Sequence, residues 1–137
     1  MNIPRSLMLM IKGVVPYVNF LQERDGGLNR RQIVPLGHNC YLDLDKEILV
    51  KDNLPIALSR VQFRVLHCLA DKLGQPVFSH ELTAYAWGSE AFTSRNDLYV
   101  YINRLRQRLE DNPKQPQCLL SLRGLGYILY PRKDARS

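Results

Sequence analysis

Residues 94–110 read S-R-N-D-L-Y-V-Y-I-N-R-L-R-Q-R-L-E, and this stretch decides the fold. Its apolar residues recur at i, i+4, i+7 and i+11, and at about 100° per residue they align along one side of a helix. They are Leu98, Ile102, Leu105 and Leu109. Ser94 precedes this stripe and Asp97 lies three residues further on, a spacing that satisfies free amides in a first helical turn. The pattern predicts a helix with one buried face, roughly 22 Å long at ~1.5 Å per residue.

The opposite side of this helix is polar and mostly uncharged or basic. On a helical wheel the residues that point away from the stripe are Asn96, Val100, Asn103, Arg104 and Gln107, flanked by Tyr99 and Arg106 on one side and by Tyr101 and Arg108 on the other. Amides and guanidiniums are the groups that read base edges and phosphates in a major groove. A solvated amphipathic helix would have a similar composition, so both readings stay open until the rest of the chain is considered.

The positive charge is concentrated at the C-terminal end. The 137 residues fit one domain with an additional segment, and their net charge is +6. Residues 1–94 hold ten Lys and Arg against nine Asp and Glu, whereas residues 95–137 hold nine against four. Such a one-sided field suits a polyanionic partner.

The cysteines and histidines do not form a site in the sequence. Cys40, Cys68 and Cys118 are widely spaced and contain no C-x-x-C pair. We therefore expect reduced thiols in a cytoplasmic protein, with no metal and no cofactor. No nucleophile, base and orienting group come together along the chain, so the sequence does not predict an enzyme.

Residues 1–30 form an N-terminal extension or linker. The apolar run from Leu7 to Val15 is interrupted by Lys12 and is far shorter than the ~20 residues that cross a bilayer, so we expect no membrane contact. Its helical rhythm fits either a helix packed on the domain's own core or a docking or homodimer surface, of which we favour the second. The glycines of Asp25-Gly26-Gly27 then read as a linker.

Short extended pieces and two helices precede the basic helix. Four pieces alternate in period two and predict an antiparallel meander: Ile33–Leu36, Cys40–Leu44, Glu47–Lys51 and Leu54–Leu58. Ser59-Arg60-Val61-Gln62 has the form of a capping box and opens a helix that runs to about Leu73. A shorter helix follows at about Ser79–Trp87, and a loop then leads to the basic helix.

Two short strands follow the basic helix, at Leu119–Leu122 and Tyr127–Tyr130. Arg123-Gly124-Leu125-Gly126 joins them, and its glycines supply the positive φ that hairpin turns need. The isolated G-x-G is weak evidence for a phosphate cradle because no helix follows it. The order of elements predicts an α+β fold, a winged helix-turn-helix with an N-terminal antiparallel meander, a three-helix core and a C-terminal β-hairpin wing.

Four motifs resemble a specific family. L-S-R-V-Q-F-R-V-L, A-W-G, V-Y-I-N-R-L-R-Q-R-L-E and L-R-G-L-G-Y are similar to the OmpR/PhoB-type effector domain of bacterial response regulators. The resemblance covers about residues 31–131 and leaves residues 132–137 as a tail. It implies a DNA-binding regulator of transcription whose recognition helix enters the major groove and whose wing reaches the minor groove.

The resemblance also assigns roles by position. Val100 and Arg104 match base-reading positions, and we add Asn103, whose amide suits adenine. The implied contacts to the DNA backbone or groove are Asn96, Tyr101, Arg106, Ser121, Arg123 and Tyr127. The implied contact loop for RNA polymerase comprises Gly88, Ser89, Glu90, Ala91, Phe92 and Thr93.

The chain departs from the family in two respects. Asn96 and Asn103 stand where arginines are frequent, so these two positions differ from those behind the family's usual base preference. Residues 1–30 are too short for a phosphoacceptor receiver domain, so we expect either a fragment of a longer regulator or a stand-alone regulator. An alternative function is a winged-helix interaction module that uses its basic face on an acidic protein. Only a DNA reader should prefer one duplex over a scrambled one.

Overall fold

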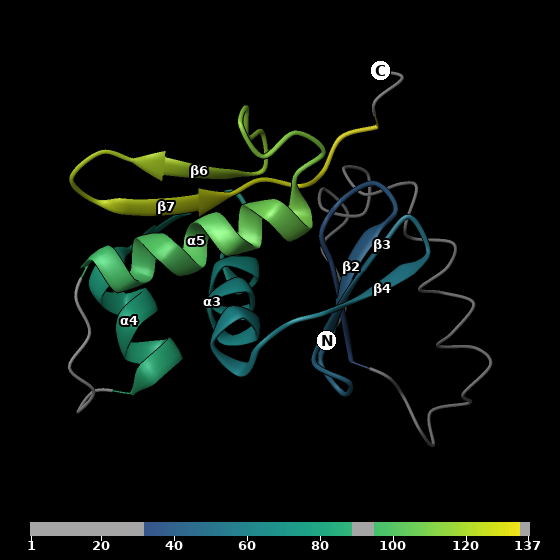
Figure 1. The fold of residues 1–137 in the computed structure, drawn as a ribbon, viewed down its shortest axis with the longest axis horizontal. Helices are drawn as coiled ribbons and strands as arrows, with labels where there is room; N and C mark the ends of the chain where they lie inside the picture. Colours follow the sequence, from purple (N-terminus) through teal and green to yellow (C-terminus); the bar gives the residue numbers. More distant parts are fainter. Residues whose placement is uncertain (1–31, 89–94, 135–137) are drawn as a thin grey trace. The chain divides into compact units, whose positions relative to one another are not determined.

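The computed structural model describes residues 32–88 and 95–134, without the side chains of residues 95 and 96 (Figure 1). The chain forms two compact units. The described residues of the first are 32–57 and 131–134, and the second comprises residues 58–130. The predictions made for residues 1–30, including a dimer surface, lie outside the described residues.

The first unit is the predicted meander. Its strands β1 (Ile33–Pro35), β2 (Cys40–Asp43), β3 (Ile48–Lys51) and β4 (Leu54–Ala57) are antiparallel and lie in sequence order. Tight turns join them, with positive φ at Asn39 (44°), Asp52 (52°) and Asn53 (66°). Asparagine and aspartate tolerate this conformation better than most residues, which explains the turn positions.

Arg132 belongs to this unit although the sequence placed it in a tail. Its N–H donates to the Leu36 carbonyl and its own carbonyl accepts from the His38 N–H, both at 2.7 Å. Its guanidinium forms a two-pronged ion pair with the Asp52 carboxylate at 2.7 and 3.0 Å. Gly37 has a φ of 105°, and a Cβ there would collide with the Arg132 backbone. Only glycine permits this close approach.

The second unit contains the three predicted helices, α3 (Arg60–Asp71), α4 (Ser79–Trp87) and α5 (Arg95–Leu109). The capping box of α3 is confirmed, since Ser59 Oγ accepts from the Gln62 N–H and Gln62 Oε1 accepts from the Ser59 N–H. The predicted end of α3 at Leu73 is two residues too late. Gly74, with a φ of 80°, donates its N–H to the Leu129 carbonyl and so turns the chain toward the sheet.

The C-terminal sheet has one more strand than the sequence predicted. The strands β6 (Leu119–Leu122) and β7 (Gly126–Leu129) form the expected hairpin, and β5 (Pro76–Phe78) pairs with the other edge of β7. A Cβ on Gly126 would collide with the Val77 carbonyl, so glycine is required where β5 approaches. Three residues are too few to show an alternating pattern, which is why β5 was missed.

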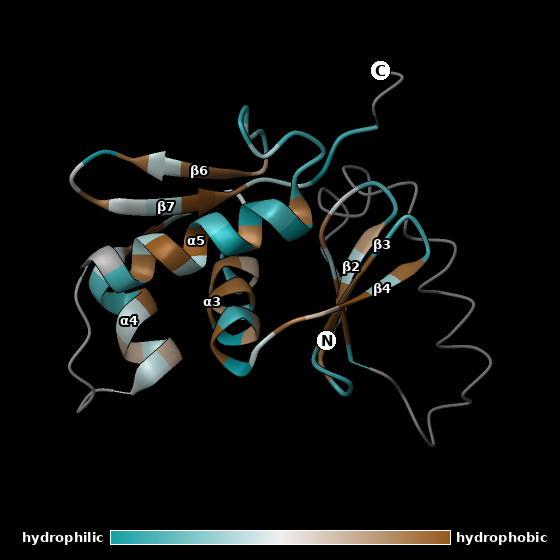
Figure 2. Ribbon diagram, viewed as in Figure 1, coloured by the Kyte–Doolittle hydropathy of each residue, from teal (hydrophilic) through white to brown (hydrophobic). Residues whose placement is uncertain are grey.

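The core of the second unit lies between the helices and this sheet. All four residues of the α5 stripe are buried, as predicted. The other elements contribute Val65, Leu66, Leu69, Val77, Leu82, Ala86, Leu119 and Leu129. The helix α5 lies along the hairpin, with α3 and α4 on its other side (Figure 1), and apolar residues recur along each of these elements (Figure 2). Within the described residues, no helix has both the length and the apolar character that a membrane span requires.

Candidate nucleic-acid interface

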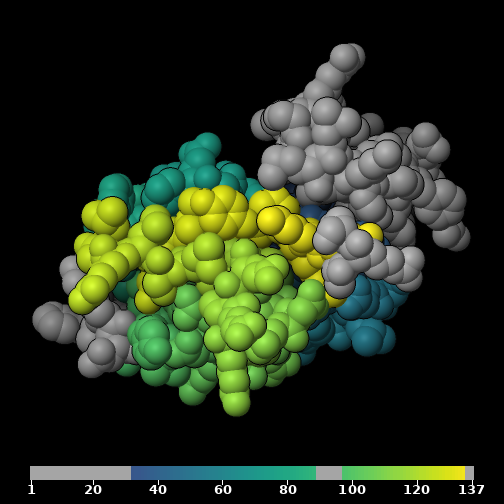
Figure 3. Space-filling model, turned by 90° about the horizontal axis from the view of Figure 1, so that it is seen from above, coloured from purple at the N-terminus to yellow at the C-terminus, as the bar shows by residue number. Residues whose placement is uncertain are grey.

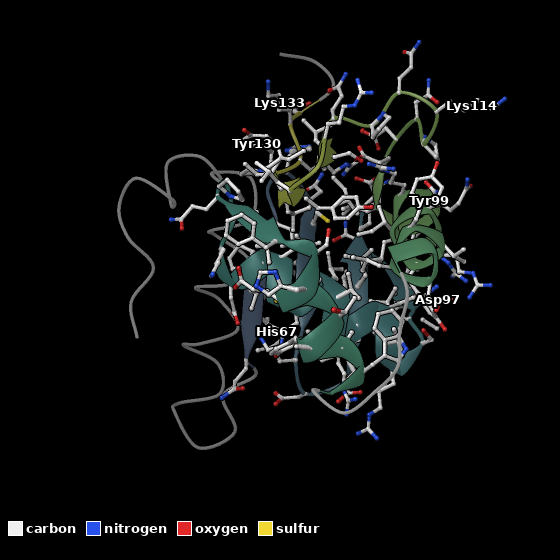
Figure 4. The ribbon with its side chains drawn as sticks, turned by 90° about the vertical axis from the view of Figure 1, so that its left-hand side faces the viewer. His67, Asp97, Tyr99, Lys114, Tyr130 and Lys133 are labelled. Carbon is white, nitrogen blue, oxygen red and sulfur yellow. The ribbon has the colours of Figure 1, made fainter. Side chains whose placement is uncertain are left out.

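The outward face of α5 presents two of the three side chains that the sequence predicted for base reading, Val100 and Arg104, whereas the third, Asn103, is half-buried. Val100 is 43% exposed, and Arg104 and Gln107 are also exposed, whereas the stripe beneath them is buried. Asp97 and Tyr99 also lie on α5 (Figure 4). His67 lies on α3, at a distance from both in this view. A helix that is anchored by one apolar stripe and presents polar groups on the opposite side can enter a groove without losing its packing.

Arg104 is held against an aromatic side chain. Its guanidinium carbon lies 5.1 Å from the centre of the Tyr101 ring. The Tyr101 ring in turn packs edge-on against Trp87 of α4, at 5.3 Å between ring centres. A cation over a ring face is attracted by the ring quadrupole, and the guanidinium keeps its N–H edges free to donate. The contact with Trp87 restrains the Tyr101 ring, and this ring in turn holds the Arg104 guanidinium.

Arg106 does not lie where the helical wheel placed it. The wheel put it on an outward flank, but its side chain is only 9% exposed, so that placement is wrong. Its Nε donates to the Leu119 carbonyl at 3.0 Å, one terminal nitrogen donates to Ser121 Oγ at 3.0 Å, and the other donates to Asn103 Oδ1 at 3.2 Å. The strand β6 covers this flank of the helix, which a single-helix projection cannot reveal.

The contact through Arg106 joins the recognition helix to the wing. Seen from above, the light-green end of α5 with the loop that follows it and the yellow hairpin form one continuous face (Figure 3). Asn103 is half-buried and its amide oxygen accepts from Arg106, whereas Ser121 on β6 accepts from Arg106 and is exposed. The structure thus brings together Asn103, Arg106 and Ser121, which the sequence had assigned separately.

The wing carries an exposed cation at its turn. Arg123 and Gly124 are exposed, Gly124 has a φ of 77°, and the Leu125 N–H donates to the Leu122 carbonyl to close the turn. The Leu125 carbonyl accepts from the Ser79 N–H at 3.1 Å, which attaches the turn to the start of α4. The turn therefore presents Arg123 from a fixed position.

Tyr127 lies deeper in the wing than a groove contact would suggest. It is 9% exposed, and burial raises the pKa of its phenol, although the nearby positive charge of Arg106 acts in the opposite direction. A tyrosine hydroxyl is protonated at neutral pH even without this shift, so it can act as a hydrogen-bond donor.

Glu110 lies next to the candidate interface, and the sequence analysis did not predict a role for it. It is buried, and its carboxylate accepts hydrogen bonds from the N–H groups of Gln117 (3.0 Å), Cys118 (2.9 Å) and Leu119 (2.7 Å). One helical turn beyond Arg106, it ties the end of α5 to the start of β6. An acidic residue before a helix-breaking Asp-Asn-Pro is normally expected to be exposed to solvent. The one sequence feature that indicates burial is its position directly after Leu109, the last residue of the stripe.

Some predicted contacts lie outside the described residues. Ser89, Glu90, Ala91, Phe92 and Thr93 of the expected polymerase loop and the side chain of Asn96 are among them. Gly88 is described, with a φ of 91° and its N–H bonded to the Ala84 carbonyl at the end of α4. In the described part of the chain, none of the three cysteines forms a disulfide, and no group of three His, Cys, Asp or Glu side chains could hold a metal ion.

Several relatives resemble this chain in sequence. It is 33% identical over 127 residues to the probable transcriptional regulator ycf27 of Porphyra purpurea, covering 91% of this chain and 51% of that protein. It is 32% identical over 93 residues to the uncharacterised transcriptional regulatory protein YcbL of Bacillus subtilis, covering 67% of this chain and 41% of that protein. The chain thus spans about half the length of these curated relatives.

Solved structures and a family match agree with the fold. The DNA-binding domain of Klebsiella pneumoniae RstA, in complex with the RstA box, is 26% identical with a TM-score of 0.65, covering 74% of this chain and 99% of that one. The DNA-binding domain of CpxR from E. coli is 25% identical with a TM-score of 0.59, covering 68% and 91%. Residues 53–129 match the family described as "Transcriptional regulatory protein, C terminal". The chain belongs to this family, and its domain is of the OmpR/PhoB type.

Proposed function

We propose that this chain binds double-stranded DNA sequence-specifically in the regulation of transcription. In this proposal α5 lies in the major groove and the β6–β7 wing reaches the adjacent minor groove. The observation that carries it is the arrangement of α5, whose buried stripe anchors it while Val100 and Arg104 face outward beside a wing with an exposed Arg123. Family membership and the DNA complex solved for RstA support it.

The chemistry of the exposed groups fits a duplex better than an acidic protein. A guanidinium can donate two parallel hydrogen bonds to guanine O6 and N7, and a small apolar group can contact a thymine methyl. Arg104 and Val100 are one helical turn apart on the same face, so both can face the same groove. The excess of positive charge in residues 95–137 adds attraction that depends on salt but not on base sequence.

The proposal describes a binding module in the cytoplasm, without a catalytic step. A contact with RNA polymerase through residues 88–93 and self-association through residues 1–30 are further proposals for the whole regulator. They rest on the family resemblance and on the apolar pattern of the sequence.

A selection from random duplexes with the purified chain tests the proposed function. We expect an enriched motif, and titrations should then show tighter binding to that motif than to a scrambled duplex of equal length and composition. Both affinities should fall with salt, since phosphate contacts displace counterions. Equal affinity for the two duplexes at every salt concentration would instead support the acidic-protein alternative.

A further inference from the structure

The buried guanidinium of Arg106 has a use that its family position does not predict. It is attached to both DNA-facing elements, to Asn103 on α5 and to Ser121 and the Leu119 carbonyl on β6. All three acceptors are uncharged. In the described part of the chain this is an arginine almost removed from solvent whose hydrogen bonds connect two residues of the candidate interface.

These contacts determine the orientation of the Asn103 amide. A guanidinium only donates hydrogen bonds, so the atom of Asn103 that faces it at 3.2 Å must be the oxygen. The amide nitrogen is then directed away from Arg106 and is available as a donor. Recognition of adenine needs the amide nitrogen as a donor to N7 and the amide oxygen as an acceptor for the N6 amino group. The oxygen has two lone pairs, so it can accept from Arg106 and from N6 together, whereas a rotated amide would present the wrong pattern.

The same argument applies to Ser121. Its Oγ lies 3.0 Å from the second terminal nitrogen of Arg106 and accepts that hydrogen bond. The hydroxyl proton of Ser121 therefore points elsewhere and can be donated to a phosphate oxygen. One guanidinium thus sets the polarity of two side chains, and a third bond to the Leu119 carbonyl holds the guanidinium itself.

We propose that Arg106 is a positioning residue for DNA recognition, which orients the Asn103 amide and the Ser121 hydroxyl toward the duplex instead of contacting phosphate itself. This inference rests on the proposed DNA-binding function. It predicts that the shape of the guanidinium matters and that its charge alone does not suffice, because an ammonium cannot reach three acceptors in the same planar arrangement.

The experiment compares Arg106→Lys and Arg106→Gln with Asn103→Ala in the full chain, on the selected duplex and on single base-pair variants of it. Asn103→Ala first identifies the base pair that Asn103 reads. We expect both Arg106 variants to lose discrimination at that same base pair, by about tenfold, and to keep their discrimination elsewhere. The Asn103→Ala/Arg106→Lys double variant should lose no more than the single variants, because the two residues act as one unit.

Salt dependence separates this role from a phosphate contact. A direct contact would survive in Arg106→Lys and would disappear in Arg106→Gln, with a log–log salt slope smaller by about one unit. Discrimination retained in Arg106→Lys together with that slope change would overturn the proposal. The exposed Arg108→Ala serves as the matched control for removing one arginine from α5. Urea unfolding of each variant identifies losses that come from instability, and an equal loss on every duplex would also count against positioning.

A measurement without DNA keeps the inference distinct from the proposed function. In the free chain, the Nε–H of Arg106 should exchange with water more slowly than that of exposed Arg104, as observed by NMR, because it is bonded to the Leu119 carbonyl. Slow exchange in a chain that prefers no duplex would reject the DNA-binding function while leaving the arginine contact intact. Equally fast exchange at both arginines would reject the contact itself.

Discussion

Two sides of α5 carry the same kinds of side chain and use them differently. On the outward side, Arg104 is exposed and rests on the Tyr101 ring. On the side that faces the wing, Arg106 and Glu110 are buried and hydrogen-bonded to β6 or to the residues just before it. Arginines two residues apart therefore have different roles. A helical position sets the direction of a side chain, but the neighbouring element determines whether that side chain remains available to a partner.

The side that faces the β6–β7 hairpin explains how the two elements of the candidate interface keep a fixed geometry. Arg106 and Glu110 lie one turn apart and carry opposite charges, and each satisfies backbone groups of the chain that leads into or forms β6. Hydrogen bonds of charged groups are stronger than those between neutral groups, particularly where water is excluded. On the outward side, Arg104 instead keeps its N–H groups exposed over the Tyr101 ring.

The largest expected effect comes from removing Glu110. Glu110→Ala leaves three backbone N–H groups without their acceptor, at Gln117, Cys118 and Leu119. Cys118 and Leu119 are buried, whereas water can reach the N–H of exposed Gln117. Each unsatisfied buried donor costs about 1–3 kcal/mol, so we expect a loss of about 3 kcal/mol in the free energy of unfolding. Urea denaturation measures this. Glu110→Gln, which keeps an acceptor oxygen, should lose less, and a change below about 0.5 kcal/mol in Glu110→Ala would contradict the assigned role.

The sequence predicted the elements whose signals are local. The stripe of α5, the capping box at Ser59 and the hairpin around Gly124 depend on residues a few positions apart, and the structure confirms all three. The outward orientation of Val100 and Arg104 followed from the same periodicity. Local periodicity and turn chemistry thus carried most of the fold.

The features that the sequence missed depend on distant partners. Arg106 is buried by β6, whose Leu119 lies thirteen residues further on, and β5 exists because Val77 pairs with Tyr127. Arg132 is fixed by Asp52, which lies eighty residues earlier. No local pattern encodes such pairs, so the difference between the exposed side of the helix and the side bonded to β6 could not be read from the sequence.

The next effect concerns the outward side and should appear only when DNA is present. Arg104→Ala should lose about 1–3 kcal/mol of discrimination at one or two base pairs, because two parallel hydrogen bonds to guanine disappear. Its free energy of unfolding should change by less than about 0.5 kcal/mol, since the side chain is exposed. Titrations on the selected and scrambled duplexes measure the first quantity, and urea denaturation measures the second.

A second arginine on the same helix separates base reading from attraction by charge. Arg108→Ala, the control on the same helix, should weaken binding to both duplexes alike if that exposed cation acts only through charge. If Arg104→Ala also weakened both duplexes alike, Arg104 would be a phosphate contact and the outward face would be wrongly placed in the groove.

A smaller effect tests the contact between Arg104 and the Tyr101 ring. Tyr101→Leu removes the ring at 5.1 Å from the guanidinium carbon, whereas Tyr101→Phe keeps it. A cation–ring contact at an exposed site is worth about 0.5–1 kcal/mol, so we expect Tyr101→Leu to lose about threefold in discrimination at the base pair read by Arg104. Tyr101→Phe should keep it. Equal losses in both variants would assign the effect to the Tyr101 hydroxyl, as expected if that hydroxyl contacts the DNA backbone.

The smallest effect that we predict concerns Arg123, an exposed arginine on the wing. Arg123 is exposed at a closed turn, and within the described residues it forms no hydrogen bond or ion pair, so its guanidinium is as available as that of Arg104. A narrow A·T-rich minor groove has an enhanced negative potential that attracts an inserted arginine. Arg123→Ala should therefore weaken binding to the selected site more when A·T pairs flank it than when G·C pairs do, by about twofold to threefold.

Arg123→Lys keeps the charge but is more strongly hydrated, and should show an intermediate difference. Titrations of both variants on the two flanked duplexes measure the effect at one salt concentration. Equal losses on both duplexes would show that the wing contacts only phosphate and that its exposed arginine does not read the shape of the groove.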